Sequence, residues 1–457
     1  RALPLAALDA IGEMLAFSKL EQPYAGLLRL RELCRPASLG SFVWALFEAW
    51  EKGSAAGKEV WAFHALAHLG DDVCAARLAQ RMRIWPGEGA LQRAIAALEV
   101  LTAMGSDVAL MHLHGFAQKA KSRGLQHKAQ AKIDAIAEAR GLSAEQLADR
   151  LVPDLGLDEH GTLRLDFGTR QFSVGFDEAL RPSVRDASGT TLRELPKPGR
   201  ADDATLAAIA SDRYKSLKTT VRALGSQQIA RLQLAMCTRR RWSAADWQAL
   251  IVRHPLLRHL ARRLLWAQYV DGQRQGCLRV AEDLTLADAS DAPLTLGEGV
   301  EIGLVHAIDL SAAEAAAFGQ QFADYEILQP FAQLGREVYR LSTQETALSE
   351  LTRFAGRKVA SGSLFGLEAH GWRRDNLDGI WFNTWTRQLQ PDFEARLVFS
   401  PGCQVNDAQS DPLQTLQSLE LRRPRAWGEE ARRRWGDLDP LLSSEVLRDV
   451  DRMAEVG

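Results

Sequence analysis

The chain has 457 residues, of which 46% are hydrophobic and 25% are charged, and its formal net charge is −2. This length exceeds one ordinary hydrophobic core, so we expect a soluble globular protein of several domains. A net charge near zero excludes a global electrostatic field that would draw the protein onto nucleic acid or a membrane.

Cysteine usage and hydropathy narrow the class further. The five cysteines are widely scattered and form no C-x-x-C pair, which is typical of free thiols in a reducing compartment. No run of 18 apolar residues is present, so we expect no membrane partner. We therefore expect a cytoplasmic protein. Because residue 1 is arginine, we also expect it to be the C-terminal part of a longer protein.

Residues 1–152 are predicted to form a helical region. Apolar residues recur there at three- and four-residue spacing, and short turns with glycine or proline separate the periodic segments. Gly70, Gly105 and Gly141 lie 35 and 36 residues apart, and each suits the left-handed residue after a helix C-terminus. This period predicts HEAT-like α-helical repeats, with an irregular helical bundle as the alternative. The clearest helices are expected at 4–17, 40–52, 58–70, 90–105 and 127–141.

Residues 153–200 are predicted to form a small antiparallel β meander followed by a proline-rich connector. Four segments between residues 162 and 196 alternate apolar with polar residues, and glycine, aspartate and serine separate them. The meander opens on Asp154, Asp158, Glu159 and His160. Their spacing does not match a calcium loop, so we expect these carboxylates to cap and solvate a turn.

Residues 201–271 are predicted to be helical. Amphipathic helices are expected at 204–224, 226–242 and 256–270. A further helix begins at Ser243, which forms a capping-box pattern with Asp246, and stops before Pro255.

Residues 272–457 are predicted to form a mixed β/α domain, which makes the whole chain a multi-domain α+β protein. A helix capped by Ser311 and Glu314 interrupts the strand patterns, and a terminal helix at 443–456 carries an apolar seam. On the strand at 393–402, Phe393, Ala395, Leu397 and Phe399 share one face. Other strands are expected at 276–288, 300–310, 337–342 and 377–385.

Several separated blocks resemble a known family. The blocks at 150–174, 195–203, 254–266, 323–339 and 443–451 are similar to a bacterial family of unknown function numbered 4132, whose members are sometimes labelled molybdate metabolism regulator-like. The resemblance runs from about residue 140 to the end of the chain. It implies no activity and no catalytic residues. Relatives often carry an upstream WGR domain, a module also found beside poly(ADP-ribose) polymerases, which implies nucleic-acid-linked regulation.

The usual motifs of enzymes are missing from the sequence. It contains no G-x-x-x-x-G-K-[ST], no G-x-G-x-x-G before a helix and no G-x-S-x-G. No complete ligand set for a metal is apparent, so we expect neither a metal nor another cofactor. His370, with Glu368 and Arg373 nearby, is the one candidate for acid–base chemistry. An ordinary polar loop is the preferred interpretation of that segment.

Arginine–tryptophan stretches are the strongest sign of a binding function. One comprises Arg239, Arg240, Arg241 and Trp242, and the second comprises Arg432, Arg433, Arg434 and Trp435; a third lies at 422–427. Arginine and tryptophan are common at protein interfaces and also at nucleic-acid contacts. Acidic residues close to these stretches weaken the interpretation as a nucleic-acid contact. The alternative is a buried tryptophan with arginines around it.

From these observations we expect a non-catalytic interaction or regulatory protein. It would bind a macromolecular partner through its helical repeats and its Trp/Arg surfaces, with a protein as the expected partner. The competing hypothesis is an enzyme of unfamiliar type, with a cleft in the C-terminal domain.

Overall fold

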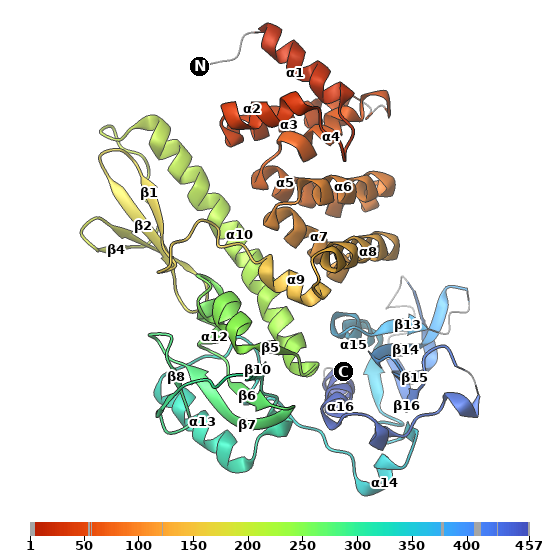
Figure 1. Ribbon diagram of the computed structural model, residues 1–457. Helices are drawn as coiled ribbons and strands as arrows, with labels where there is room; N and C mark the ends of the chain where they lie inside the picture. The colour runs from red at the N-terminus through yellow and green to blue at the C-terminus, as the bar shows by residue number, and fades with distance from the viewer. Residues whose placement is uncertain are drawn as a thin grey trace. The chain divides into compact units, whose positions relative to one another are not determined.

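The computed structural model describes residues 5–53, 55, 57–120, 122–375, 379–405, 413–426 and 428–455. The chain divides into two compact units, Arg1–Leu155 and Gly156–Gly457. The first is helical and the second combines helices with antiparallel sheets (Figure 1). The predicted mixture of α and β structure is therefore confirmed.

The first unit consists of successive helices that bury their apolar faces in one core. Phe47, Phe63 and Trp85 lie at an aromatic centre of this core, and all three are almost fully buried. The helices are α1 (Leu5–Phe17), α2 (Ala25–Leu33), α3 (Pro36–Lys52), η1 (Gly57–Glu59), α4 (Trp61–Leu69), α5 (Asp72–Ile84), η2 (Trp85–Glu88), α6 (Leu91–Met104), α7 (Asp107–Lys119), α8 (Arg123–Ala139) and α9 (Ala144–Arg150).

Two of the three repeated glycines have the predicted conformation. Gly105 and Gly141 follow helix ends with φ of 64° and 65°, in the left-handed region that favours glycine. The prediction was wrong for Gly70, whose φ and ψ are −71° and 156°. A Cβ at Gly70 would lie 2.3 Å from the carbonyl oxygen of Leu66, so close backbone approach explains the glycine there.

The second unit begins with the predicted meander, which is confirmed. Its four strands pair antiparallel in the order β1-β2-β3-β4. In the turn before β1, the Asp158 carboxylate accepts hydrogen bonds from the backbone N–H groups of His160 and Thr162 and from the Thr162 hydroxyl. The Asp158 carboxylate thus caps a turn, which is the role expected for it from the sequence. The strands are β1 (Leu163–Asp166), β2 (Gln171–Phe176), β3 (Pro182–Asp186) and β4 (Thr191–Leu192).

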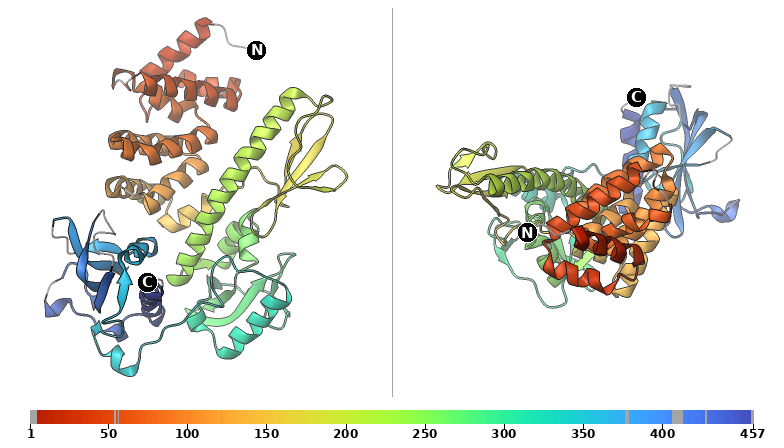
Figure 2. Two further views of the ribbon diagram at one scale, coloured as in Figure 1. Left: turned by 180° about the vertical axis from the view of Figure 1, so that it is seen from behind. Right: turned by 90° about the horizontal axis from the view of Figure 1, so that it is seen from above.

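One long helix, α10 (Ala204–Cys237), replaces two predicted helices. Figure 2 shows it lying along the meander in both views. The expected break at Gly225 was wrong because glycine serves packing there: a Cβ would lie 2.7 Å from Cδ1 of Leu180. The helix also ends earlier than predicted, and Arg241–Ser243 forms strand β5.

The middle of the second unit is a six-stranded antiparallel sheet with short helices. Its strand order is β5-β10-β6-β7-β8-β9. The helix expected at 256–270 is shorter than predicted, because residues from Trp266 onward pair as β6. The elements are α11 (Ala244–Trp247), η3 (Gln248–Val252), α12 (Leu257–Ala261), β6 (Trp266–Val270), β7 (Gln273–Val280), β8 (Leu286–Ala287), β9 (Pro293–Leu294), β10 (Glu301–Leu304), η4 (Ala307–Asp309) and α13 (Ala312–Asp324).

The capping box at the start of α13 is confirmed and gives a testable pH dependence. A hydrogen bond from Arg274, together with bonds from the backbone and hydroxyl of Ser311, lowers the pKa of Glu314 from 4.5 to about 2. A lowered pKa means that the stabilisation is complete above pH 4.5 and is lost as the pH falls toward 2. In thermal melts, Glu314→Gln should therefore lower Tm at pH 6, and the gap from wild type should close below pH 4.5. A gap that widens in acid would contradict this, and Glu298→Gln, at an exposed position, is the control.

The C-terminal part is an antiparallel sheet of order β11-β16-β15-β14-β13, with β12 paired to β16. Helix α16 covers its apolar face with the predicted seam of Val446, Leu447, Val450 and Met453, all buried. The elements are α14 (Thr343–Thr346), β11 (Glu350–Leu351), β12 (Lys358–Ala360), α15 (Ser361–Gly366), η5 (Leu367–His370), β13 (Arg373–Asp375), β14 (Trp381–Gln390), β15 (Phe393–Gln404), β16 (Leu413–Arg422), η6 (Glu429–Ala431), η7 (Trp435–Asp437) and α16 (Pro440–Glu455).

The strand predicted at 337–342 was wrong. This segment joins no strand ladder, and side chains of α16 bind it instead. The N–H of Tyr339 donates to Ser444, and its hydroxyl donates to Asp451.

A buried ion cluster connects α16 to the middle of the unit. Arg336 binds both carboxylate oxygens of Glu445, and the guanidinium and carboxylate side chains are only 2% and 5% exposed. His306 accepts a hydrogen bond at Nδ1 from the N–H of Ile308, so its Nε2 carries the proton and donates to Glu445. Burial opposes charge on Glu445, yet these two partners hold its pKa well below the ordinary value. His306 is thus a core histidine whose two ring nitrogens both have hydrogen-bond partners.

Among the described residues, no helix is long and apolar enough to cross a membrane. The same residues contain no group of three or more His, Cys, Asp or Glu side chains placed to hold a metal ion.

Candidate binding surface on the C-terminal sheet

One row of side chains crosses the C-terminal sheet on the face opposite α16. Successive residues of a strand point to opposite faces, and the buried row Trp385, Leu397, Leu419 and Leu351 faces the core. The neighbouring row therefore lies on the other face, which we call the outer face. In the order of the strands, this row is Arg373, Thr386, Arg396, Glu420 and Glu350.

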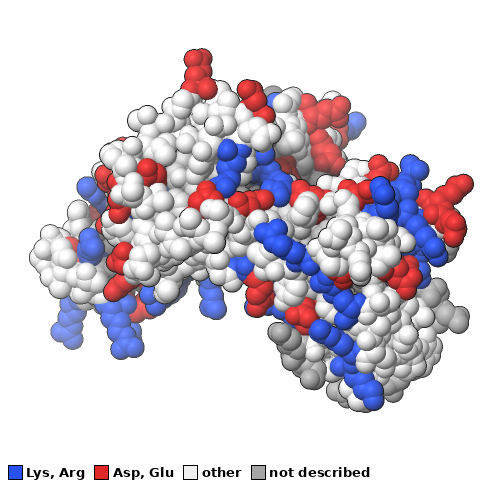
Figure 3. Space-filling view, turned by 90° about the horizontal axis from the view of Figure 1, so that it is seen from below, with Lys and Arg blue, Asp and Glu red and all other residues white. Residues whose placement is uncertain are grey.

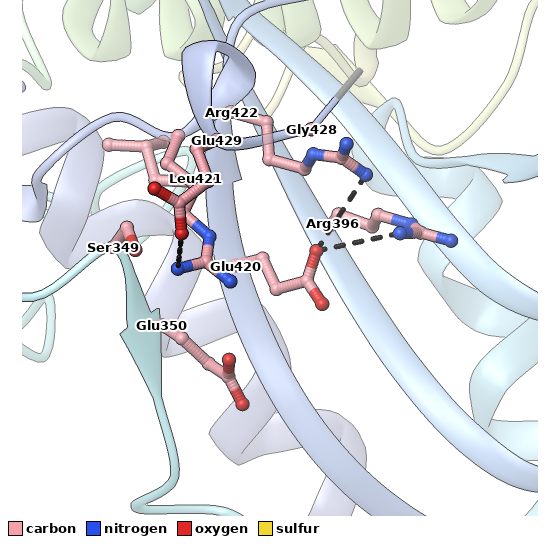
Figure 4. A pocket seen from close by; sticks show the side chains of 9 residues that line it. Ser349, Glu350, Arg396, Glu420, Leu421, Arg422, Gly428 and Glu429 are labelled. Atoms are coloured by element: carbon pink, nitrogen blue, oxygen red, sulfur yellow. Dashed lines mark hydrogen bonds and ion pairs between the residues drawn. The ribbon is translucent and has the colours of Figure 1, made fainter. Parts of the chain in front are cut away.

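The anionic end of this row opens into a pocket of about 320 Å³. Figure 4 shows Glu420 between Arg396 and Arg422, with Glu350 to one side. One oxygen of Glu420 lies 3.5 Å from Arg396 and 3.9 Å from Arg422. These ion pairs are long, and Nε of Arg396 has no hydrogen-bond partner within the part of the chain that is described. The lining residues are Ser349, Glu350, Arg396, Glu420, Leu421, Arg422, Gly428, Glu429 and Arg432.

The second predicted Trp/Arg stretch is split by the fold. Arg432 lines the pocket, where it lies 3.5 Å from Glu429. Arg434 pairs with Asp437, and Arg433 donates to backbone carbonyls nearby. Trp435 is fully buried in the core of the sheet, so a surface role for its ring is corrected. Trp427, in the third stretch, lies outside the described residues.

The first stretch is built into the middle sheet. Arg239 binds Asp309 and Asp439 and so links this sheet to the segment before α16. The guanidinium of Arg240 lies over the ring of Trp242, and that of Arg241 lies over Tyr269. Trp242 is only 5% exposed, so its ring is a core group as well.

The three candidates for acid–base chemistry do not come together. His370 places Nδ1 3.0 Å from Oδ1 of the buried Asp449, on the α16 side of the sheet. Glu368 pairs with Arg374, whereas Arg373 lies on the outer face. The second oxygen of Asp449 accepts hydrogen bonds from Trp372 and Arg387, which compensate its charge. This arrangement ties α16 to the sheet, and it places one of the three candidates, the half-exposed His370 ring, against a buried carboxylate.

The thiol of Cys237 lies against Glu445 and Arg336 in the buried ion cluster, and it is a poor nucleophile there. Burial raises the pKa of Cys237 to about 12, so its thiol stays protonated.

Comparisons with known proteins find relatives, but none with an assigned function. Residues 189–372 match the model of a family described as "Domain of unknown function (DUF4132)". Over 420 residues the chain is 39% identical to the "Uncharacterized protein YehI" of Escherichia coli (strain K12), a match that covers 91% of this chain. It covers 34% of that relative, so the chain spans about a third of the relative's length. No solved structure matches. The predicted resemblance is confirmed at this level: the chain is similar to proteins of unknown function.

Proposed function

We propose that the chain is a non-catalytic interaction or regulatory protein, and that the outer face of the C-terminal sheet binds a protein partner. The pocket carries the proposal, because it gathers three arginines and three glutamates, and the ion pairs that Glu420 and Glu429 form with these arginines are 3.5–3.9 Å long. Arginine is enriched at protein interfaces, where its planar guanidinium forms paired hydrogen bonds with carboxylates and carbonyls. A partner that supplies shorter bonds can replace these long ones.

A protein partner fits the charges better than nucleic acid does. The pocket holds equal numbers of cationic and anionic side chains, whereas a phosphate backbone calls for a wide basic face. In the view of Figure 3, acidic side chains lie interspersed among the basic ones. The ring of Trp381, which is 41% exposed, can contact a partner, unlike those of Trp242 and Trp435. The nucleic-acid-linked pathway and the WGR association stay predictions.

The helical first unit is proposed to add a second surface. If its helices stack as HEAT-like repeats, they would offer an extended concave face to the same partner.

An enzyme remains the second candidate, for one reason. The His370 ring is half exposed and is oriented by a buried carboxylate, which is how a general base is held. Among the described residues, no group of three or more His, Cys, Asp or Glu side chains is placed to hold a metal ion. The pocket lies on the outer face of the sheet, whereas His370 lies on the side of α16.

Photo-crosslinking tests the proposed surface. With p-benzoylphenylalanine in place of Ser349, which lines the pocket, irradiation of living bacterial cells should give one discrete protein adduct. The adduct should disappear with Arg422→Glu, because a reversed charge at the pocket repels the group that Arg422 binds. The same probe at the exposed Thr191 is the control.

His370→Ala should leave the adduct unchanged. No adduct from position 349, or an adduct of equal yield from position 191, would contradict the proposed function.

A further inference from the structure

One stretch around α12 carries positive charge and no acidic residue. Between Asp246 and Asp271 the sequence contains four arginines and two histidines, but no aspartate or glutamate. The N–H of residue 262 donates to the carbonyl of residue 258, so the helical turn continues past the end of α12. Helical spacing therefore places four of the basic side chains on one side of this turn, opposite the buried leucines. We call these four residues the basic cluster: Arg258, His259, Arg262 and Arg263.

Backbone carbonyls of other segments hold two of the arginines in place. Arg258 donates to the carbonyl of Glu159, in the turn before β1. Arg263 donates to the carbonyl of Glu178, over 2.7 Å, and to that of Leu328. These carbonyls fix the guanidiniums but carry no full negative charge.

The cluster has little counter-charge. Among the described residues, Arg258 and Arg263 form no ion pair. Arg262 forms a long one, 3.6 Å from Glu282, whose side chain is 93% exposed and therefore screened by water. Two buried nitrogens, Nε of Arg258 and Nδ1 of His259, have no hydrogen-bond partner within the same part of the chain. Buried polar atoms normally have partners, so these two are free to bind a ligand.

The ring of His259 lies within the combined field of the three arginines. Its pKa is lowered to about 4, first by burial and then by their charges, against an opposing effect of Asp177. Burial and Arg262 likewise lower the pKa of Arg258, against Asp158. Both carboxylates have other partners, because Asp158 caps its own turn and Asp177 forms an ion pair within its own hairpin. The cluster is thus a compact group of cations that a bound anion would stabilise.

We propose that the basic cluster binds a phosphate group, as free phosphate or as the phosphate monoester of a small molecule. Guanidinium groups form paired, charge-assisted hydrogen bonds with phosphate oxygens, and the phosphate supplies the negative charge that the cluster lacks. A single phosphate fits better than a nucleic-acid strand, which needs a wider basic surface. Here the acidic Asp158, Asp177 and Glu178 lie close to the arginines and limit that surface. The site is separate from the outer face of the C-terminal sheet and does not depend on the function proposed for it.

Isothermal titration calorimetry of the whole chain with inorganic phosphate tests this site, in a chloride buffer of low ionic strength. Wild type should show saturable binding. Arg262→Gln should weaken the association constant by about tenfold or more, because it removes a charge-assisted contact. An unchanged Tm without phosphate should show that this variant folds, since the substitution removes only a long, screened ion pair. Lys358→Gln, which removes an exposed charge on β12, is the control and should bind as wild type does.

Two further probes identify the source of the phosphate group. Glycerol 3-phosphate that binds at least as tightly as inorganic phosphate assigns the site to a monoester, and weaker binding assigns it to free phosphate. The proposal would be overturned if wild type showed no saturable binding of either probe, or if Arg262→Gln bound phosphate as well as wild type. A single-stranded oligonucleotide that binds far more tightly than both probes, and is lost with Arg262→Gln, would overturn it in favour of a nucleic-acid surface.

Discussion

Glu445→Ala is expected to lower the free energy of unfolding by about 3–5 kcal/mol, measured by urea denaturation at pH 7. The substitution leaves the buried Arg336 guanidinium without the carboxylate that pairs with it, and it removes the acceptor of the His306 ring proton. The Glu445 carboxylate joins α16 to the middle of the second unit. Its removal should therefore weaken the contact between these two parts.

Two comparisons make this result specific. Asp212→Ala, which removes an exposed ion pair with Lys215, should change the free energy of unfolding by less than about 0.5 kcal/mol. Arg336→Met combined with Glu445→Leu should be more stable than Glu445→Ala, because no buried charge is left unpaired. If Glu445→Ala were no more harmful than Asp212→Ala, the buried cluster as described would be wrong.

Trp435→Ala is expected to cost about 3–5 kcal/mol of unfolding free energy, because it removes a fully buried indole from a packed core. The measurement is again a denaturation curve, with near-ultraviolet circular dichroism to report the packing of the remaining aromatic rings.

Trp381→Ala is the matched control, since the same side chain is 41% exposed there. It should cost no more than about 1 kcal/mol and should act instead on the crosslink yield from position 349. The reverse pattern, with a stable Trp435→Ala variant that loses the adduct, would restore the surface role expected from the sequence.

The local signals in the sequence predicted much of the secondary structure. Alternation predicted the meander, and the apolar seam of α16 was evident from Val446, Leu447, Val450 and Met453. Ser311 and Glu314 identified the start of α13. The predictions failed where contacts with residues distant in the sequence determine the secondary structure. Gly225 resembles a break but lies inside α10, where Leu180 packs against it.

The candidate site was only partly predictable. Arg373 and Arg432 were selected from the sequence, although for different reasons. Arg396 and Glu420 were missed, yet the apolar alternation of Ala395 and Leu397 already implied that Arg396 lies on the opposite face. Which charges face one another across strands depends on register, and no local pattern reveals it. Trp435 was also assigned to the surface, because it follows three arginines in the sequence. Its burial depends on contacts with distant residues, which no local pattern reveals.

The crosslink from position 349 tests the central claim most directly, because it asks what touches the outer face in the cell. The account predicts one protein adduct that is lost with Arg422→Glu and retained with His370→Ala. The claim would be contradicted if position 349 gave no protein adduct, or if Arg422→Glu left the adduct unchanged.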